Sequence, residues 1–316
     1  MTHIRFLLPL MIVCHTAALG QGLDAYLESG AEGAYLDWEE GFVQARGRAF
    51  ISRDIKRSEI YYKQTRQAAI ADGQAKALST LGRIWLDSST RLEENQELFK
   101  RVKKLMEDGS STQIESDTGR VFEVVTKLSL RGENGIAALV LPRASAASPR
   151  GAAPPSAAGS ATGLVVDATG IGPVSTALLP RVIDENGRVV FGAETADPAV
   201  AQREGLVAYA VRAAPAQAAA AAESDVPEPS MAGVRQGRAP IVVKARSAGG
   251  TGRADLVLSV ADADRVLAAD AAGMFLRDCR VLVVIPAQPP PPPRPARVRQ
   301  RVPPAQEAPG DPNRLP

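Results

Sequence analysis

Few side chains of this sequence could carry out histidine or thiol chemistry. Both histidines, His3 and His15, and one of the two cysteines, Cys14, fall within the first twenty residues. If that segment is removed as a leader, catalytic triads, Cys-His pairs and zinc sites built on histidine or thiolate are all excluded. The remaining Cys279 stands just before the apolar run 281–285. We expect a buried, inert thiol, with an intermolecular disulfide as the alternative.

A glycine-containing segment, Asp167-Ala168-Thr169-Gly170-Ile171-Gly172, follows a predicted strand, where a phosphate-binding loop would begin. No third glycine or lysine completes a nucleotide-binding motif, and Pro173 interrupts any following helix. We therefore expect a tight structural turn.

Three carboxylates, Asp37, Glu39 and Glu40, flank Trp38, an aromatic residue that could stack on a sugar. A glycosidase needs two carboxyl groups held across a cleft, and neighbours in sequence do not provide that arrangement. We expect a solvated strand edge with Trp38 in the core.

A basic stretch is formed by Lys100, Arg101, Lys103 and Lys104. It could contact acidic lipid or polymer, but such a helix face is usually just hydrated. The sequence thus predicts no catalytic, cofactor-binding or metal-binding residue, and no cofactor.

The N-terminus has the features of a secretory leader. Arg5 precedes the apolar run 6–13, and Ala18-Leu19-Gly20 offers small residues for cleavage before Gln21. The run is shorter than the ~20 residues of a membrane-spanning helix. Acylation of Cys14 is an alternative, although Val13 is bulkier than the residue preferred before such a cysteine.

Composition divides the rest of the chain. Alanine, serine, proline and glycine dominate 143–162, which has little to bury, and the end of the chain opens with a proline run. The predicted organisation is a leader (1–20), a first domain (21–142), a linker (143–162), a second domain (163–287) and a Pro-rich disordered tail (288–316).

The first domain is predicted to be a small helix-on-sheet unit. Residues 42–51 alternate as in a strand, and apolar stripes predict helices over 64–85 and 94–106, with a short strand between them. Two further strands, one around Ile114 and one over 121–130, flank a turn and should form a hairpin.

The second domain is predicted to be mixed α/β. Strands are expected over 163–168 and 241–245, and Asn186-Gly187 predicts a tight hairpin with positive φ angles. A capping pattern at Ser259 starts a helix between strands 255–260 and 281–285. This strand-helix-strand unit predicts that the two strands pair in parallel. The fold class is therefore α+β.

Two stretches resemble known families. Residues 47–50, with 68–78 and a strand such as 121–130, resemble the twenty-kilodalton outer-membrane lipoprotein family, which is related to flagellar assembly protein T and flagellar basal-disk lipoproteins. Residues 162–170 and 179–187 are similar to the C-terminal half of uncharacterised exported proteins that carry that domain. The resemblance implies a helix-on-sheet domain and an assembly role without catalytic residues, but the chain departs from it at the acylation cysteine.

Charge balance argues against nucleic acid as a partner. The chain has 37 basic and 35 acidic residues, so loss of Arg5 with the leader leaves a net charge of +1.

We expect an exported, non-enzymatic assembly or scaffold protein of the periplasm or outer membrane of a Gram-negative bacterium, with association with the flagellum as one form of that role. Its partners would be proteins or copies of itself, and the basic tail could contact the cell wall. A module that binds cell-wall polymer or a small ligand is the alternative, followed by a carboxylate-based hydrolase.

Overall fold

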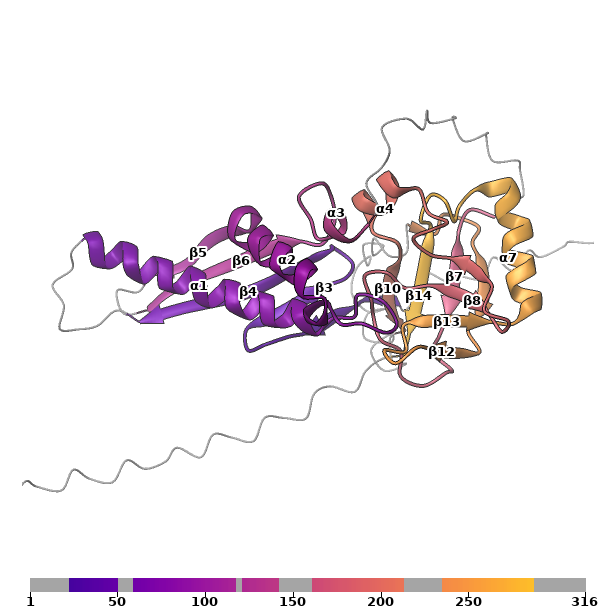
Figure 1. Ribbon diagram of the computed structural model, residues 1–316, viewed down its shortest axis with the longest axis horizontal. Helices are drawn as coiled ribbons and strands as arrows, with labels where there is room; N and C mark the ends of the chain where they lie inside the picture. The colour runs from indigo at the N-terminus through magenta and orange to yellow at the C-terminus, as the bar shows by residue number, and fades with distance from the viewer. Residues whose placement is uncertain (1–22, 51–58, 118–120, 142–160, 213–234, 287–316) are drawn as a thin grey trace, which may run out of the picture.

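The computed structural model describes residues 23–50, 59–117, 121–141, 161–212 and 235–286, in which two domains lie end to end in an elongated molecule (Figure 1). Helices and several sheets are both present, so the predicted α+β class is confirmed. The predicted leader, most of the linker and the tail lie outside the described residues. Among the described residues, no helix combines the length and apolar character needed to cross a membrane.

The first domain is built on a five-stranded antiparallel sheet in the order β2-β3-β4-β6-β5. Its strands are β2 (Leu27–Ser29), β3 (Ala34–Asp37), β4 (Phe42–Phe50), β5 (Ser111–Asp117) and β6 (Val121–Ser129). The predicted strand and the predicted hairpin are both confirmed, because β4 and β5 each pair with β6. Residue 51 and the hairpin turn at 118–120 lie outside the described residues.

Two helices cover one face of this sheet, α1 (Glu59–Arg83) and α2 (Gln96–Gly109) (Figure 1). On α2, Leu98, Val102 and Met106 are buried, as the apolar stripe predicts. On α1, small residues such as Ala69 and Gly73 face the sheet. They let the helix backbone approach the strand closely.

The predicted short strand between the two helices is absent from the described chain. Trp85 forms only isolated bridges, one with Arg91 and one with Ala177 of the second domain, and a short 3-10 helix, Leu92–Glu94, leads into α2. Asn95 then caps α2 by accepting a hydrogen bond from the backbone N–H of Leu98 at 3.1 Å. This connection also contacts the second domain, where Leu178 and Leu179 donate backbone hydrogen bonds to the carbonyls of Trp85 and Leu86. A short helix, α3 (Ala137–Val140), ends the first domain.

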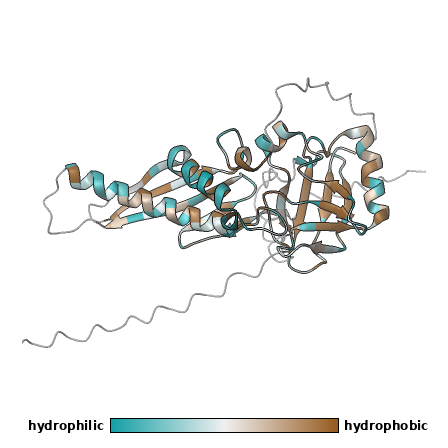
Figure 2. Ribbon diagram, viewed as in Figure 1, coloured by the Kyte–Doolittle hydropathy of each residue, from teal (hydrophilic) through white to brown (hydrophobic). Residues whose placement is uncertain are grey.

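The second domain contains a five-stranded sheet in the order β1-β10-β14-β7-β11. Its strands are β1 (Leu23–Ala25), β7 (Leu164–Asp167), β10 (Ala208–Arg212), β11 (Ile241–Lys244) and β14 (Val281–Ile285). Four of them run parallel, and only β1 is antiparallel to its neighbour β10. The parallel strands β7, β10 and β14 are mostly hydrophobic (Figure 2) and mostly buried, as expected of strands covered on both faces, whereas the edge strand β11 is partly exposed.

The first strand corrects the predicted domain boundary. Residues 23–25 were assigned to the first domain, but β1 pairs with β10, which places it in the sheet of the second domain. Three residues are too few to show the alternation by which a strand is recognised in sequence.

A second sheet has the order β12-β13-β8-β9. Its strands are β8 (Val182–Asp184), β9 (Val189–Phe191), β12 (Ser247–Gly249) and β13 (Asp255–Leu258). The helix α7 (Val260–Gly273) follows β13 and begins at Ser259, whose hydroxyl accepts a hydrogen bond from the N–H of Asp262, as predicted. A short helix, α4 (Pro198–Glu204), lies at the junction of the domains (Figure 1).

The predicted parallel pairing of 255–260 with 281–285 is wrong. A strand, a helix and a strand do follow one another as β13, α7 and β14, but β13 pairs in parallel with β8, whereas β14 pairs with β10 and β7. The helix therefore connects two different sheets. A helical crossover implies parallel pairing only when the two strands that it connects belong to the same sheet.

The predicted hairpin is confirmed, since β8 and β9 pair in antiparallel fashion. Its turn differs from the prediction, because Gly187 has a positive φ of 81° while Asn186 does not. The carboxylate of Asp184 accepts hydrogen bonds from the N–H groups of Asn186 and Arg188, both at 2.9 Å. This side chain, not a pair of left-handed residues, fixes the turn.

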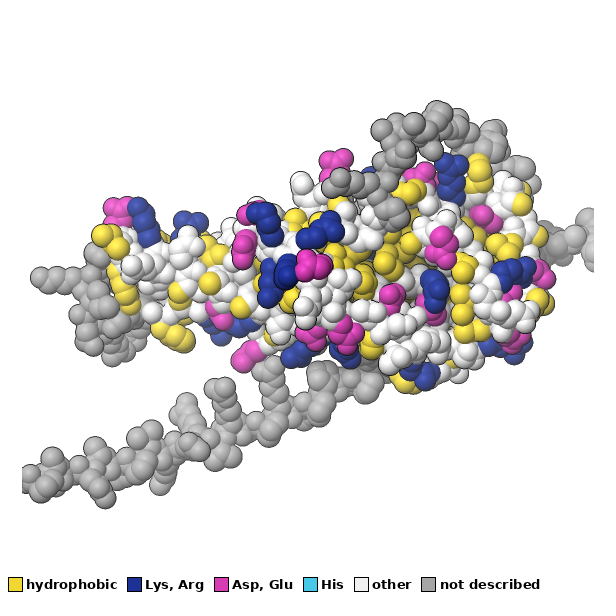
Figure 3. Space-filling view, in the orientation of Figure 1, with side chains coloured by type: hydrophobic (Ala, Val, Ile, Leu, Met, Phe, Trp, Pro, Cys, Tyr) yellow, Lys and Arg dark blue, Asp and Glu magenta, His cyan; other side chains and the backbone are white. Residues whose placement is uncertain are grey.

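The two domains share a buried interface. Trp38 of the first domain packs edge-on against Tyr209 of the second, with ring centroids 5.2 Å apart. The hydroxyl of Ser88 donates a 2.8 Å hydrogen bond to the carboxylate of Asp255, and both residues are buried. One hydrophobic cluster continues through both domains. The seam is also visible in the space-filling view, where hydrophobic side chains gather between the domains (Figure 3).

Candidate functional site

A cleft of about 750 Å³ opens at the carboxyl end of the parallel strands β7, β10 and β11. In open sheets of parallel strands, ligands bind at this edge, because the loops leave it and the strands supply a rigid base. Charged side chains line it: Asp167, Arg212, Lys244, Arg246, Asp262 and Arg265. Four are cationic and two are anionic, so the lining carries a net charge of +2.

Asp167, the last residue of β7, organises one wall. Its carboxylate accepts hydrogen bonds from the N–H of Thr169 at 3.0 Å and from the Thr169 hydroxyl at 2.6 Å. Arg212 reaches it from β10 with a 3.0 Å ion pair. Partial burial raises the pKa of this carboxyl, but the Thr169 hydrogen bonds and the charges of Arg212 and Lys244 outweigh burial and lower its pKa.

These contacts confirm the predicted structural turn at Asp167–Gly172. Gly172 adopts a φ of +79°, which favours glycine, and the guanidinium of Arg253 donates to the carbonyl of Pro173 at 2.7 Å. The turn also forms part of the cleft wall through Thr169, Gly170 and Ile171. The segment is therefore structural and yet borders the candidate site.

The opposite wall comes from the first turns of α7. Arg265 donates to the carboxylate of Asp262 at 3.0 Å and to the carbonyl of Val242 at 3.1 Å. The second bond ties the helix to the edge strand β11, whose backbone would otherwise be open on that side. Asp262 and Asp167 are thus each neutralised by an arginine.

Lys244 and Arg246 are the cations of the cleft without such a partner. Within the part of the chain that the structure describes, neither side chain makes a hydrogen bond or an ion pair. Both are exposed, and Lys244 lies next to Asp167 in the register of β11 and β7. Two positive groups thus line one cleft in which both carboxylates are already held in ion pairs, and such an arrangement is able to attract an anion.

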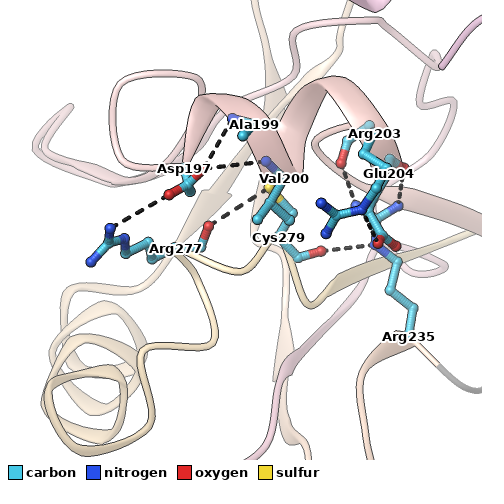
Figure 4. A network of polar contacts seen from close by, with 9 residues as sticks. Asp197, Ala199, Val200, Arg203, Glu204, Arg235, Arg277 and Cys279 are labelled. Carbon is cyan, nitrogen blue, oxygen red and sulfur yellow. Dashed lines mark hydrogen bonds and ion pairs between the residues drawn. The ribbon is translucent and has the colours of Figure 1, made fainter. Parts of the chain in front are cut away.

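Cys279 is buried, as expected, and burial raises the pKa of its thiol to about 12. Such a thiol is not a nucleophile at neutral pH. Figure 4 shows it beneath α4, where Asp197 caps the helix by accepting from the N–H of Ala199 at 2.9 Å. The intermolecular disulfide would require this part of the domain to open.

Arg235 holds the other end of α4. Its guanidinium donates to the carbonyls of Glu204, Gly205 and Leu206 and to that of Cys279 (Figure 4). Burial, and secondarily the charge of Arg131, lowers its pKa to about 10, so it remains protonated at neutral pH. This buried cation stabilises the C-terminal end of the helix.

The three carboxylates near Trp38 do not form an acid–base pair. Trp38 is buried, as predicted, and its indole N–H donates to Glu28 at 2.9 Å. Asp37 accepts from the N–H of Glu40 at 2.8 Å within a single turn, so these two residues are neighbours and do not face each other across a cleft. The geometry that a glycosidase needs is absent from these residues.

The predicted basic face of α2 is exposed. Lys100 pairs with Glu97 at 2.7 Å and Lys104 with Asp108 at 2.7 Å along the helix. Figure 3 shows cations and carboxylates intermixed over this region. This mixture of charges agrees with the prediction that the basic face of α2 is solvated.

Sequence reasoning missed the cleft. Arg212 stands at the end of one strand, and Lys244 and Arg246 follow another, with nothing in their spacing that links them. Only the pairings of β10 with β14, of β14 with β7 and of β7 with β11 bring them to one edge. In the described ranges no group of three or more potential metal ligands occurs.

No curated protein matches the chain. The family match that was found does not reach residues 42–130, so their resemblance to the outer-membrane lipoprotein and flagellar families stays a prediction. Residues 163–287, the range predicted as the second domain and the one that carries the cleft, match the family model of the second domain of Treponema pallidum Tp0624.

Proposed function

We propose that this chain is an exported, non-enzymatic binding protein of the bacterial envelope whose second domain holds an anionic ligand. The observation that supports it most is the pair Lys244 and Arg246, which lines a cleft of about 750 Å³ and whose side chains form no ion pair with a carboxylate among the described residues. The location in the periplasm or at the outer membrane rests on the leader predicted at 1–20.

Binding suits the cleft better than catalysis. Its two carboxylates, Asp167 and Asp262, are each held in an ion pair, and the lowered pKa of Asp167 makes it a poor proton donor. An exposed charge pair at 4 Å gains only about 1 kcal/mol in water. Several such contacts predict an affinity for a single anion on the order of 1 mM, strengthened by any further contact.

An assembly role is a second candidate, favoured by the far end of the first domain. The end of β4 and the start of α1 lie at the pole opposite the second domain (Figure 1). Phe50 of β4 and Ile60 and Tyr62 of α1 are 77%, 70% and 42% exposed. Exposed apolar side chains gathered in one place mark protein contacts more often than scattered ones do. This role would use a different surface from the cleft, so the two functions are compatible.

The binding function is tested with the Lys244→Ala/Arg246→Ala double variant. Calorimetric titration of the mature protein with phosphate and with citrate should give saturable binding that falls at least tenfold in the variant. The matched control, Lys100→Ala/Arg101→Ala, removes the same charge from exposed positions on α2 and should bind as the unmodified protein does.

The same preparation tests the other parts of the proposal. Protein from the envelope fraction should have an N-terminal mass corresponding to Gln21 or a close neighbour, and an intact Met1 in the cytoplasm would contradict export. Rings or polymers in sedimentation would favour the assembly role. Equal anion binding by both double variants would rule out the cleft as the site.

A further inference from the structure

The two cleft cations that form no ion pair among the described residues belong to one extended segment. From Val242 to Arg246 the exposure of the side chains alternates, since Val242, Lys244 and Arg246 are exposed whereas Val243 and Ala245 are buried. This period of two is that of an extended chain, in which alternate side chains leave on the same side. Lys244 and Arg246 are therefore neighbours on the exposed side of the segment, and both line the cleft.

The backbone that carries these two cations is held at two points. The N–H of Ala245 donates to the carbonyl of Asp167 on β7 at 2.9 Å, and the N–H of Arg246 donates to the carbonyl of Val257 on β13 at 2.7 Å. The segment thus connects the two sheets of the second domain and is tied to each of them. Two residues of extended chain span at most about 7 Å. The side chains of Lys244 and Arg246 therefore start from a fixed and short separation.

The other two cations of the cleft already have partners. Arg212 forms an ion pair with Asp167, and Arg265 forms one with Asp262. A ligand therefore meets two uncompensated positive charges, those of Lys244 and Arg246. Because like charges repel, these two side chains stay apart unless a ligand draws them together, which costs side-chain freedom. Two separate negative groups can neutralise each cation where it stands.

The cleft is also larger and less polar than a site for a small inorganic ion. Its volume of about 750 Å³ lies in the range of sites that hold organic ligands. Half of the residues that line it are uncharged: Thr169, Gly170, Ile171, Val242, Val243 and Ala245. Val242 is 38% exposed and precedes Lys244 on the same side of the segment. The lining thus offers an uncharged surface next to the two cations.

We propose that the cleft binds an organic dianion whose two negative groups are separated by a short uncharged spacer. One group contacts Lys244, the other contacts Arg246, and the spacer lies against the uncharged part of the lining. A carboxylate suits Arg246 in particular, because a guanidinium can donate two parallel hydrogen bonds to it. This inference rests on the proposed function and specifies the class of ligand that the same site takes.

The test uses dicarboxylates of increasing length. The probes are succinate, glutarate, adipate, pimelate and suberate, with hexanoate as the monoanion that matches adipate in length and phosphate as the compact anion. The proteins are the mature protein, the single variants Lys244→Ala and Arg246→Ala, and the control Lys100→Ala on α2, far from the cleft lining. Affinities are measured by calorimetric titration at constant ionic strength, because salt screens exposed charges.

The mature protein should bind the dicarboxylates with an optimum at an intermediate length, and the best of them about tenfold or more tighter than hexanoate, since two linked contacts reinforce each other. Each single variant should bind that dicarboxylate only about as well as hexanoate. Hexanoate itself should lose only about twofold in either variant, because the remaining cation still holds it. The control should bind every probe as the mature protein does.

Other results would separate the two proposals. Hexanoate or phosphate bound as tightly as the best dicarboxylate, or lost completely in each single variant, would mean that both cations hold one anionic group. That outcome, like an affinity that does not depend on length, would overturn the spaced dianion and leave the proposed function intact. If the mature protein binds none of these anions, the proposed function itself is overturned.

Discussion

Asp167 lies between two cations at the end of the parallel sheet, Arg212 on one side and Lys244 on the other. It has two opposing effects. It anchors the turn through Thr169, and its negative charge competes with any anion for the same cations. A residue that stabilises the wall of a binding site can therefore limit the affinity of that site.

Replacing Asp167 by asparagine should separate these effects. Removal of the charge should tighten phosphate binding several-fold, since one charge contact at 4 Å is worth about 1 kcal/mol. The control Asp264→Asn makes the same change in net charge on α7, outside the residues that line the cleft, and should leave affinity unchanged. Weaker binding by Asp167→Asn would mean that the carboxylate contacts the ligand itself.

Stability should respond to pH in the direction set by the pKa of Asp167. Because that pKa is lowered in the folded protein, the carboxylate stabilises the fold above its unfolded value of about 3.9, and the contribution disappears as pH falls through the folded value. The melting temperatures of wild type and Asp167→Asn should thus differ by a few degrees at pH 7, begin to approach each other only below about pH 4, and converge once the pH is below the lowered folded pKa.

Among the elements, α1 and β4 approach each other more closely than any side chain would allow. A methyl group added at Gly47 would overlap the carbonyl oxygen of Ala69 and the backbone of Gly73 on the helix. Helix and strand can therefore touch only because both positions are glycine. This contact fixes the position of the helix over the sheet.

The variant Gly47→Ala is expected to destabilise the protein by about 3 kcal/mol, measured by denaturant unfolding, because neither backbone can move without disturbing the sheet. Gly170→Ala is the control, since nothing lies within 4 Å of an added methyl group there. Its effect should stay within about 0.5 kcal/mol. If the two variants lose a comparable amount of unfolding free energy, the helix moves away from the strand and accommodates the added methyl group.

The elements that sequence reasoning located are those with a periodic pattern of their own. The apolar stripe of α2, the alternation of β4 and the cap at Ser259 were each visible in one short stretch. The pairing of strands was harder to predict from the sequence, since β13 and β14 belong to different sheets although a helix joins them. The cleft required three such pairings at once, which no local pattern contains.

At the scale of the whole molecule, the two domains share an interface that is polar as well as apolar. Asp255 accepts hydrogen bonds from Ser88 of the first domain and from Arg181 of the second, and it is almost completely buried. Backbone bonds add to it, as where Leu179 donates to the carbonyl of Leu86 at 2.7 Å. The Ala-, Ser- and Pro-rich composition of 143–162 predicts instead two units that fold independently on either side of a linker.

A protein with a specific protease site inserted after Gly151 tests this difference. After cleavage the two fragments should still elute together from a sizing column and separate only in denaturant. The variant Asp255→Ala should weaken their association by about 2 kcal/mol, because it leaves the partners of a buried carboxylate unpaired. If the two fragments separate after cleavage without denaturant and each remains folded, the domains fold independently and the interface does not hold them together.

The pairing of β1 with β10 also affects the order in which the protein folds during its synthesis. Synthesis proceeds from the N-terminus, so β1 is made before the whole first domain, and its partner strand only long afterwards. The first domain is in effect an insertion between two neighbouring strands of one sheet, and contacts between such distant residues form slowly. Until β1 docks, one edge of β10 offers unpaired backbone groups to any nearby chain. The interval before docking is therefore when a newly made molecule is most exposed to pairing with the wrong neighbour.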